Sequence, residues 1–140
     1  MEEKKIRFGH EKLEVYQRSL KFIAWLDEII LSAERNRNII DQIDKASISV
    51  SLNIAEGNGK SSKKDQNRFL EISRGSSLEC AACLDVMFAK RMISSGKADE
   101  GKEQLEVIVK MLFKLSQSIL GSITEKPTHS PNLSHSLSHH

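Results

Sequence analysis

The sequence has few cysteines, prolines, glycines and aromatic residues. Its 140 residues include two cysteines, two prolines and seven glycines, too few for a disulfide framework or for a sandwich or barrel built on Gly- and Pro-rich turns. No apolar run approaches the roughly 18 residues of a membrane-spanning helix. The opening Met-Glu-Glu-Lys-Lys has no apolar stretch behind it, which argues against a signal peptide. We therefore expect a cytoplasmic protein with reduced thiols and no membrane partner.

Charge is nearly balanced, with 21 Lys and Arg against 19 Asp and Glu and a formal net charge of +2. Its distribution is uneven, because the stretch 60–74 holds five basic residues against two acidic ones. A locally basic stretch suggests contact with a polyanion, and a solvated helix end explains the same pattern. Both interpretations stay open. The basic residues are Lys60, Lys63, Lys64, Arg68 and Arg74.

Apolar residues recur at steps of three and four along most of the chain, which is typical of helices. Four segments show this spacing, over 13–33, 39–54, 62–87 and 105–123. No alternating pattern long enough for a strand competes with them. Long helices joined by short connections predict an all-α fold, an antiparallel up-down four-helix bundle over residues 1–123.

Local signals predict where these helices end. Gly57 follows the last apolar position of the second segment, where glycine is the usual left-handed C-terminal cap. Ser62 precedes Asp65 by three residues, the form of a capping box that begins the third helix. Ser94-Ser95-Gly96 is expected to separate the third helix from the fourth. Residues 124–140, which hold both prolines and four of the five histidines, predict a disordered C-terminal tail.

The first segment has more apolar surface than a small bundle needs. Beside the series that contains Tyr16, Leu20 and Ile23, a second apolar series widens the arc beyond half of the helix circumference. Such a surplus predicts a further partner, either a neighbouring helix or another subunit. We expect the second series, with the single tryptophan as an anchor, to form an oligomer interface. Its members are Val15, Phe22, Trp25 and Ile29.

The residues that usually carry catalysis lack a suitable setting. Cys80 and Cys83 lie within a helix on its apolar side, where redox chemistry and zinc binding are less plausible than a role as small buried apolar residues. No Ser-His-Asp or Cys-His arrangement and no phosphate-binding glycine loop is present. We therefore predict no catalytic residue, no metal site, no cofactor and no enzymatic activity.

Two further groups of residues suggest structural roles. Gly75 opens a run of small residues inside a helix, which favours a tight contact between helices over a ligand site. Charged residues intermixed in the same region more often form salt bridges between helices than perform acid–base chemistry. These charged residues are Glu56, Arg68, Arg74, Glu79 and Asp85.

Two stretches, from Ser51 to Lys63 and from Arg68 to Glu79, form a specific pattern in which an Asn–Ala–Glu–Gly turn precedes an Arg–Gly–Ser helix. The pattern resembles the 23S rRNA-intervening-sequence protein family, and the resemblance covers roughly Phe8 to Ile123. It implies a bacterial four-helix bundle that forms a homopentameric ring and has a poorly defined function. The accessory variability determinant of diversity-generating retroelements is similar, with a basic surface that engages nucleic acid. The residues that carry the family motif are Asn53, Glu56, Gly57, Gly59, Arg74, Gly75, Ser76 and Glu79.

Two functions of different classes follow. In the first, copies of a basic cluster around the rim of a ring bind RNA or DNA phosphates without reading bases, because avidity multiplies a weak single patch. The cluster consists of Lys60, Lys63, Lys64 and Arg68. In the second, the oligomer is a protein-interaction scaffold with no direct role in nucleic-acid binding.

Overall fold

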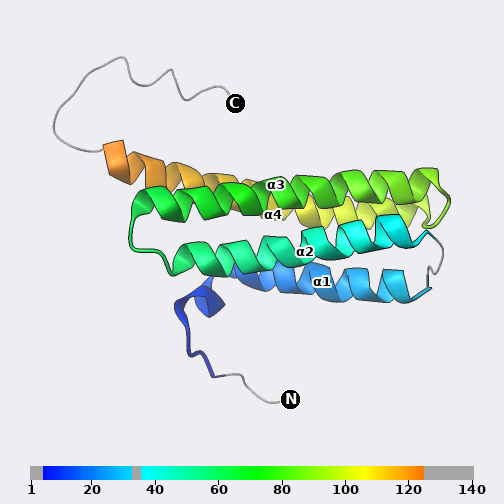
Figure 1. Cartoon of the computed structure of the whole chain (residues 1–140), viewed down its shortest axis with the longest axis horizontal. Coiled ribbons are helices and arrows are strands. Elements are labelled where there is room, and N and C mark those ends of the chain that lie inside the picture. Colours follow the sequence, from blue (N-terminus) through cyan, green and yellow to red (C-terminus); the bar gives the residue numbers. More distant parts are fainter. Residues whose placement is uncertain (1–4, 33–35, 125–140) are drawn as a thin grey trace.

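The computed structural model describes residues 5–32 and 36–124 of the chain. A short 3-10 helix, η1 (Gly9–Lys12), precedes four α-helices that run alternately up and down (Figure 1). These are α1 (Glu14–Ser32), α2 (Arg37–Asn58), α3 (Lys63–Ala89) and α4 (Ser95–Thr124). The predicted all-α bundle is confirmed. The predicted tail lies outside the described residues except at Thr124, which ends α4.

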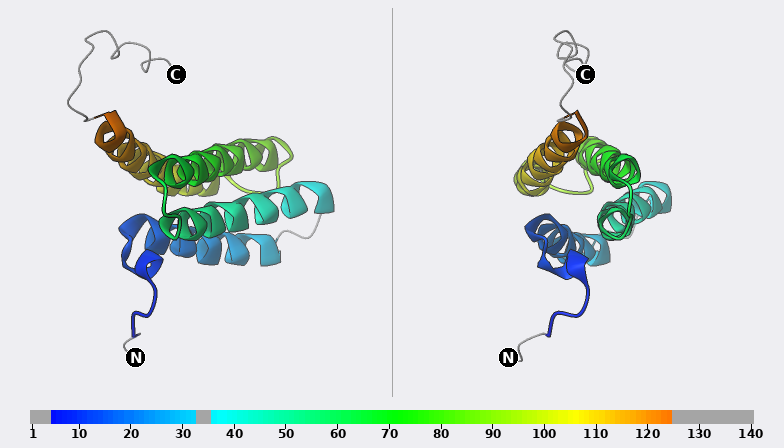
Figure 2. Two further views of the ribbon diagram at one scale, coloured as in Figure 1. Left: turned by 60° about the vertical axis from the view of Figure 1, so that its left-hand side comes forward. Right: turned by 90° about the vertical axis from the view of Figure 1, so that its left-hand side faces the viewer.

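Each helix packs against two others. α3 contacts α2 and α4, and α1 contacts the same two helices from the opposite corner of the bundle (Figure 2). The start of α1, the α2–α3 connection and the end of α4 all lie at one end of the bundle (Figure 1). This end holds the basic stretch of the sequence.

The Ser62 cap is confirmed, because its hydroxyl accepts a hydrogen bond of 3.1 Å from the Asp65 N–H. The predicted break at 94–96 is wrong by a few residues. The chain leaves α3 after Ala89 through Arg91, which has a left-handed φ of 62°, and α4 has already begun at Ser95. Ser94 caps α4 by accepting a bond from the Lys97 N–H at 3.1 Å.

Gly57 does not end α2 as predicted. It is buried inside the helix, and no glycine of the described residues has a positive φ. A Cβ at this position would lie 3.0 Å from the Phe69 Cβ and 3.2 Å from the Gln66 carbonyl oxygen on α3. The residue therefore serves the close approach of two helices.

Gly75, in contrast to Gly57, has open space around it. It is exposed, and a Cβ there would meet nothing within 4 Å. The tight contact predicted for this run is made instead by its serines, because the Ser76 hydroxyl lies 2.8 Å from that of Ser49 on α2 and Ser77 is buried.

The predicted oligomer surface of α1 lies in the core of the single chain. Val15 and Phe22 are 2% and 1% exposed, and Ile29 is also buried. Trp25 is half-buried against α4, where its Nε1–H donates to Glu100 at 3.3 Å. This prediction is therefore corrected, because the second apolar series is the stripe that faces α2 and α4. The first series is divided, because Leu26 is buried in the core and Leu20 is exposed.

Both cysteines belong to the core as predicted, free and buried. Burial first, then the nearby Cys83 and Glu79, raises the pKa of the Cys80 thiol from 9.0 to about 12. Burial also raises the pKa of Cys83. Protonated thiols are inert, so neither residue is suited to nucleophilic chemistry. Within the described part of the chain, no group of three or more His, Cys, Asp or Glu side chains could hold a metal ion.

We predict opposite effects of alanine at the two glycines. Gly75→Ala should stabilise the protein by about 1 kcal/mol, because alanine is the better residue in an exposed helix interior. Gly57→Ala should destabilise it by about 1–3 kcal/mol, because Phe69 and the α3 backbone must move. Urea unfolding of both variants measures the difference, and equal effects would contradict the close approach at Gly57.

The buried thiols predict a loss of stability at alkaline pH. Well below pH 9 the thiols are protonated in both states. As the pH rises from about 9 toward 12, the unfolded chain loses the Cys80 proton first and is favoured. The free energy of unfolding should therefore fall more steeply in the wild type than in Cys80→Ala/Cys83→Ala. Parallel pH profiles of the two proteins would refute this.

Candidate nucleic-acid interface

The connection between α2 and α3 is fixed by its own hydrogen bonds. The Gly59 and Lys60 N–H groups donate to the carbonyls of Glu56 and Gly57, each at 3.1 Å. From α3, the Gln66 amide donates to the Lys60 carbonyl at 2.8 Å. These bonds tie the end of α2 to the first turn of α3, so the basic residues on either side stand on an ordered backbone.

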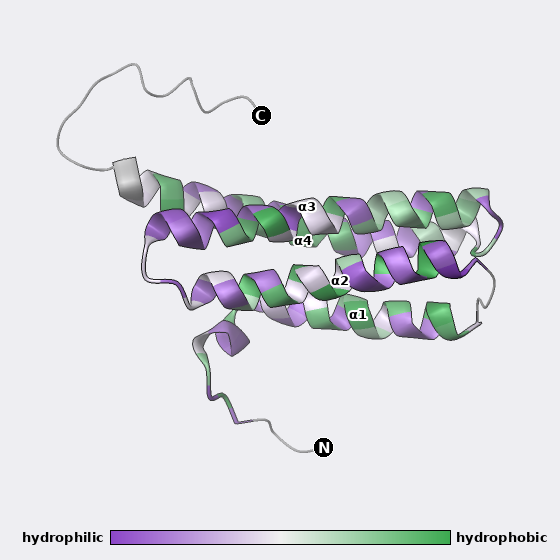
Figure 3. Cartoon of the chain, in the orientation of Figure 1, coloured by the Kyte–Doolittle hydropathy of each residue, from purple (hydrophilic) through white to green (hydrophobic). Residues whose placement is uncertain are grey.

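The four predicted nucleic-acid residues lie at this end but differ in their partners. Lys60 and Arg68 form exposed ion pairs, with Glu56 at 3.6 Å and with Asp65 at 3.7 Å. The ammonium groups of Lys63 and Lys64 are exposed, and no described residue forms a hydrogen bond or ion pair with them. The start of α3 is accordingly strongly hydrophilic (Figure 3).

Phe69 is covered by cations. The Lys60 ammonium lies 5.2 Å and the Arg68 guanidinium 4.5 Å from its ring centroid. The ring itself is half-buried beside Gly57. Cations stacked on an aromatic ring are held by its quadrupole, so this ring positions the two side chains. Because two cations lie over it and the ring is half-buried, it offers little surface for stacking a base.

Half of the family-motif residues join α2 to α3, namely Asn53, Gly57, Ser76 and Glu79. The Asn53 amide donates to the Ser49 carbonyl at 2.9 Å and to the Ser49 hydroxyl at 3.0 Å, and that hydroxyl lies 2.8 Å from the one on Ser76. Further along, Glu79 accepts a bond of 2.6 Å from Gln42. These residues hold the α2–α3 pair together.

A second cluster of polar side chains, which was not predicted from the sequence, joins α3 to α4. Buried Ser116 donates to Glu71 at 3.0 Å and to Asn67. Glu71 also pairs with Arg74 at 2.8 Å, and the Arg74 guanidinium lies 5.6 Å from the ring centroid of Phe113. The Arg74 Nε is buried without a hydrogen-bond partner among the described residues. Phe113 and Arg74 are far apart in sequence, so only the helix pairing brings them together.

Most of the charged residues predicted to bridge helices pair within one helix or its flanking turn instead. Arg68 and Arg74 each pair with a carboxylate three residues earlier, Asp65 and Glu71. Glu56 pairs with Lys60, four residues later. Asp85 does bridge two helices, because it accepts from Lys102 of α4 at 2.6 Å. Exposed pairs of this kind contribute little stability.

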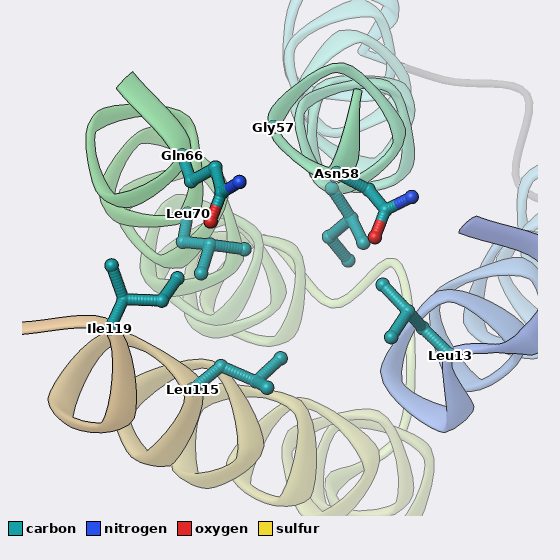
Figure 4. Close-up of a pocket in the computed structure, with 8 residues that line it drawn as sticks. Leu13, Gly57, Asn58, Gln66, Leu70, Leu115 and Ile119 are labelled. Carbon is teal, nitrogen blue, oxygen red and sulfur yellow. The ribbon is translucent and has the colours of Figure 1, made fainter. Parts of the chain in front are cut away.

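An apolar pocket of about 110 Å³ opens at the same end of the bundle. Four apolar side chains converge on it, Leu13, Leu70, Leu115 and Ile119, and the side-chain amides of Asn58 and Gln66 lie at its edge (Figure 4). The described residues that line it include no titratable or nucleophilic side chain. The pocket can hold a small apolar group and has no means to activate it.

Comparisons with known proteins identify related chains. A family model described as 23S rRNA-intervening sequence protein matches residues 11–114. A crystal structure of a protein of unknown function from the S23 ribosomal protein family of Bacteroides thetaiotaomicron is similar in fold, with a TM-score of 0.68 and 21% identity over 73% of this chain and 97% of that one. No curated protein matches the chain. No helix in the described ranges has the length and apolarity to cross a membrane.

Proposed function

The chain belongs to the 23S rRNA-intervening sequence protein family, and from this premise we propose that it is a non-enzymatic, homo-oligomeric bundle that binds the phosphate backbone of RNA or DNA. The observation that carries the proposal is the pair of exposed ammonium groups, Lys63 and Lys64, in the first turn of α3. The free amides and dipole of a helix N-terminus repel cations and attract anions. Lysines placed there add to the attraction for a phosphate, which would in turn neutralise them.

The other two basic residues can contribute once a phosphate displaces the carboxylates that they now pair with. Lys60 and Arg68 hold exposed carboxylates at 3.6 Å and 3.7 Å, and such pairs are worth about 1 kcal/mol or less. A nucleic-acid phosphate can therefore replace Glu56 or Asp65 at small cost. Contacts of this kind position a strand without reading its sequence. The proposed setting is the cytoplasm, where free thiols stay reduced.

A single copy of this cluster binds weakly, so the proposal includes an oligomer, with a pentamer as its expected form. We propose the outer seam of α1 and α2 as its interface. The hydroxyls of Ser19 and Ser51 meet at 2.8 Å inside the bundle, and the residue after each serine, Leu20 and Leu52, faces outward at the same level. Ile48 lies one turn from Leu52 and is also exposed.

The alternative function is a protein-interaction scaffold without a direct role in nucleic-acid binding. The exposed apolar side chains favour it, among them Leu52, Leu78 and Phe88, as does the formal net charge of only +2. Salt distinguishes the two functions. Phosphate contacts weaken steeply as salt rises, whereas an apolar protein interface does not.

We predict that Lys63→Glu/Lys64→Glu lowers affinity for a mixed-sequence single-stranded RNA at least about tenfold at low salt. Two phosphate contacts per chain would be lost, so the slope of log K against log salt should become shallower by about 1.4 for each chain that contacts the strand. Fluorescence anisotropy over a salt series measures both.

The control, Lys21→Glu/Lys90→Glu, makes the same change in charge at exposed lysines away from the α2–α3 connection. It should leave the slope unchanged. If both double variants lose affinity equally, overall charge is responsible and the proposed site is wrong. If the wild type binds no RNA or DNA even at low salt, the scaffold function replaces the proposal.

The proposed interface gives a separate prediction. Leu52→Glu should reduce the mass measured by light scattering to that of one chain, 15.8 kDa, because a carboxylate buried between subunits costs several kcal/mol. Leu78→Glu is the matched control, since Leu52 and Leu78 are 60% and 52% exposed. A wild type that is already monomeric at micromolar concentration would refute the oligomer.

A further inference from the structure

A groove of about 410 Å³ lies along α4 where it meets α3, away from the lysines of the α2–α3 connection. Its lining combines three cations, Arg74, Lys110 and Lys114, with apolar side chains that include Val107 and Phe113. Phe113 is 47% exposed. An exposed aromatic ring in a groove that is also lined by three cations has the composition of a site for a flat, negatively charged ligand.

The ring is held in place by its neighbours. The Arg74 guanidinium lies 5.6 Å from the Phe113 centroid and is fixed by its 2.8 Å bond to Glu71. Glu71 is fixed in turn by Ser116 of α4 at 3.0 Å. Lys110, which lines the groove, forms an exposed pair with Glu106 at 3.4 Å. Three cations against Glu71 and Glu106 leave a net positive charge beside the ring.

The groove is aligned with the proposed phosphate site. Lys63 and Arg74 are separated by eleven residues, which is three turns to within about 20°, so both lie on the same face of α3. The distance along the helix axis is about 16 Å at roughly 1.5 Å per residue. A strand with about 3.4 Å between nucleotides spans it in about five nucleotides.

We propose that Phe113 is a stacking platform for a base of single-stranded RNA or DNA, with Lys110 and Lys114 contacting the flanking phosphates. This inference rests on the proposed function and extends it from phosphate contacts to contact with a base. Every base has a π face, so stacking is tolerant of sequence and suits a strand that is held by its backbone. Lys114 is available for this role, because no described residue pairs with its ammonium group.

The charges around Phe113 disfavour a two-fold contact between copies of the chain at this groove. In a two-fold contact the same patch meets itself, so Lys110 and Lys114 of one copy would face the same cations of the other. A polyanion meets no such repulsion.

The test measures binding of a labelled oligothymidine of about ten nucleotides to the full chain by fluorescence anisotropy. Phe113→Leu should weaken binding at least about fivefold and leave the salt slope unchanged, because stacking releases no counterions. Phe113→Tyr should retain binding. Phe88→Leu, the matched control at a phenylalanine that is 49% exposed, should have no effect. Lys110→Gln/Lys114→Gln should instead reduce the salt slope by about 1.4.

The remaining outcomes overturn the inference in distinguishable ways. If Lys63→Glu/Lys64→Glu abolishes binding while Phe113→Leu behaves like Phe88→Leu, the proposed function stands and the stacking platform falls. If the wild type binds no oligothymidine at low salt, the stacking platform falls, and binding of the mixed-sequence RNA decides the proposed function separately. If Phe113→Leu lowers the oligomer mass in sedimentation, the groove is covered by another copy of the chain and not by nucleic acid.

Discussion

The close packing of α2 on α3 is the constraint on which the candidate site depends. Gly57 allows it, because any side chain at that position would come within 3.0 Å of the Phe69 Cβ. Once the two helices are this close, the hydroxyl of buried Ser73 reaches the Val50 carbonyl at 2.8 Å and Ser76 reaches Ser49. Short hydroxyl side chains satisfy one another only when backbones approach closely, so these bonds fix the register of the pair. The first turn of α3, with its lysines, is thereby held in place.

The helices were predictable from the sequence because apolar spacing is a local property, and the Ser62 cap is equally local. The inward face of α1 was not predictable. When more than half of a helix is apolar, its periodicity is compatible with two stripes, one through Leu20 and one through Phe22. The choice is made by other helices, since Gly101 leaves the space that the Trp25 ring fills. The same limitation applies to glycine, because the sequence alone does not tell a Gly57 that admits another helix from a Gly75 that faces solvent.

The candidate site was predictable in part, because ion pairs between residues three or four positions apart are local, like the helices themselves. Lys60 and Arg68 have carboxylates four and three residues away, at Glu56 and Asp65, and both pairs form. No carboxylate stands three or four residues from Lys63 or Lys64, so the sequence already contained the distinction between paired and unpaired cations. Phe113 and Arg74 belong to different helices, and only the antiparallel register of α3 and α4 brings them together.

The distinction between paired and unpaired cations also shows why a net charge of +2 is a poor measure of affinity for a polyanion. Among the described residues, eight ion pairs each neutralise a cation in place. A phosphate is attracted mainly to cations that remain unpaired and stand close together, because screening confines exposed charges to a range of about 10 Å. Lys63 and Lys64 are adjacent, unpaired and at a helix N-terminus. The local field at the start of α3 is therefore set by these two residues rather than by the sum over the chain.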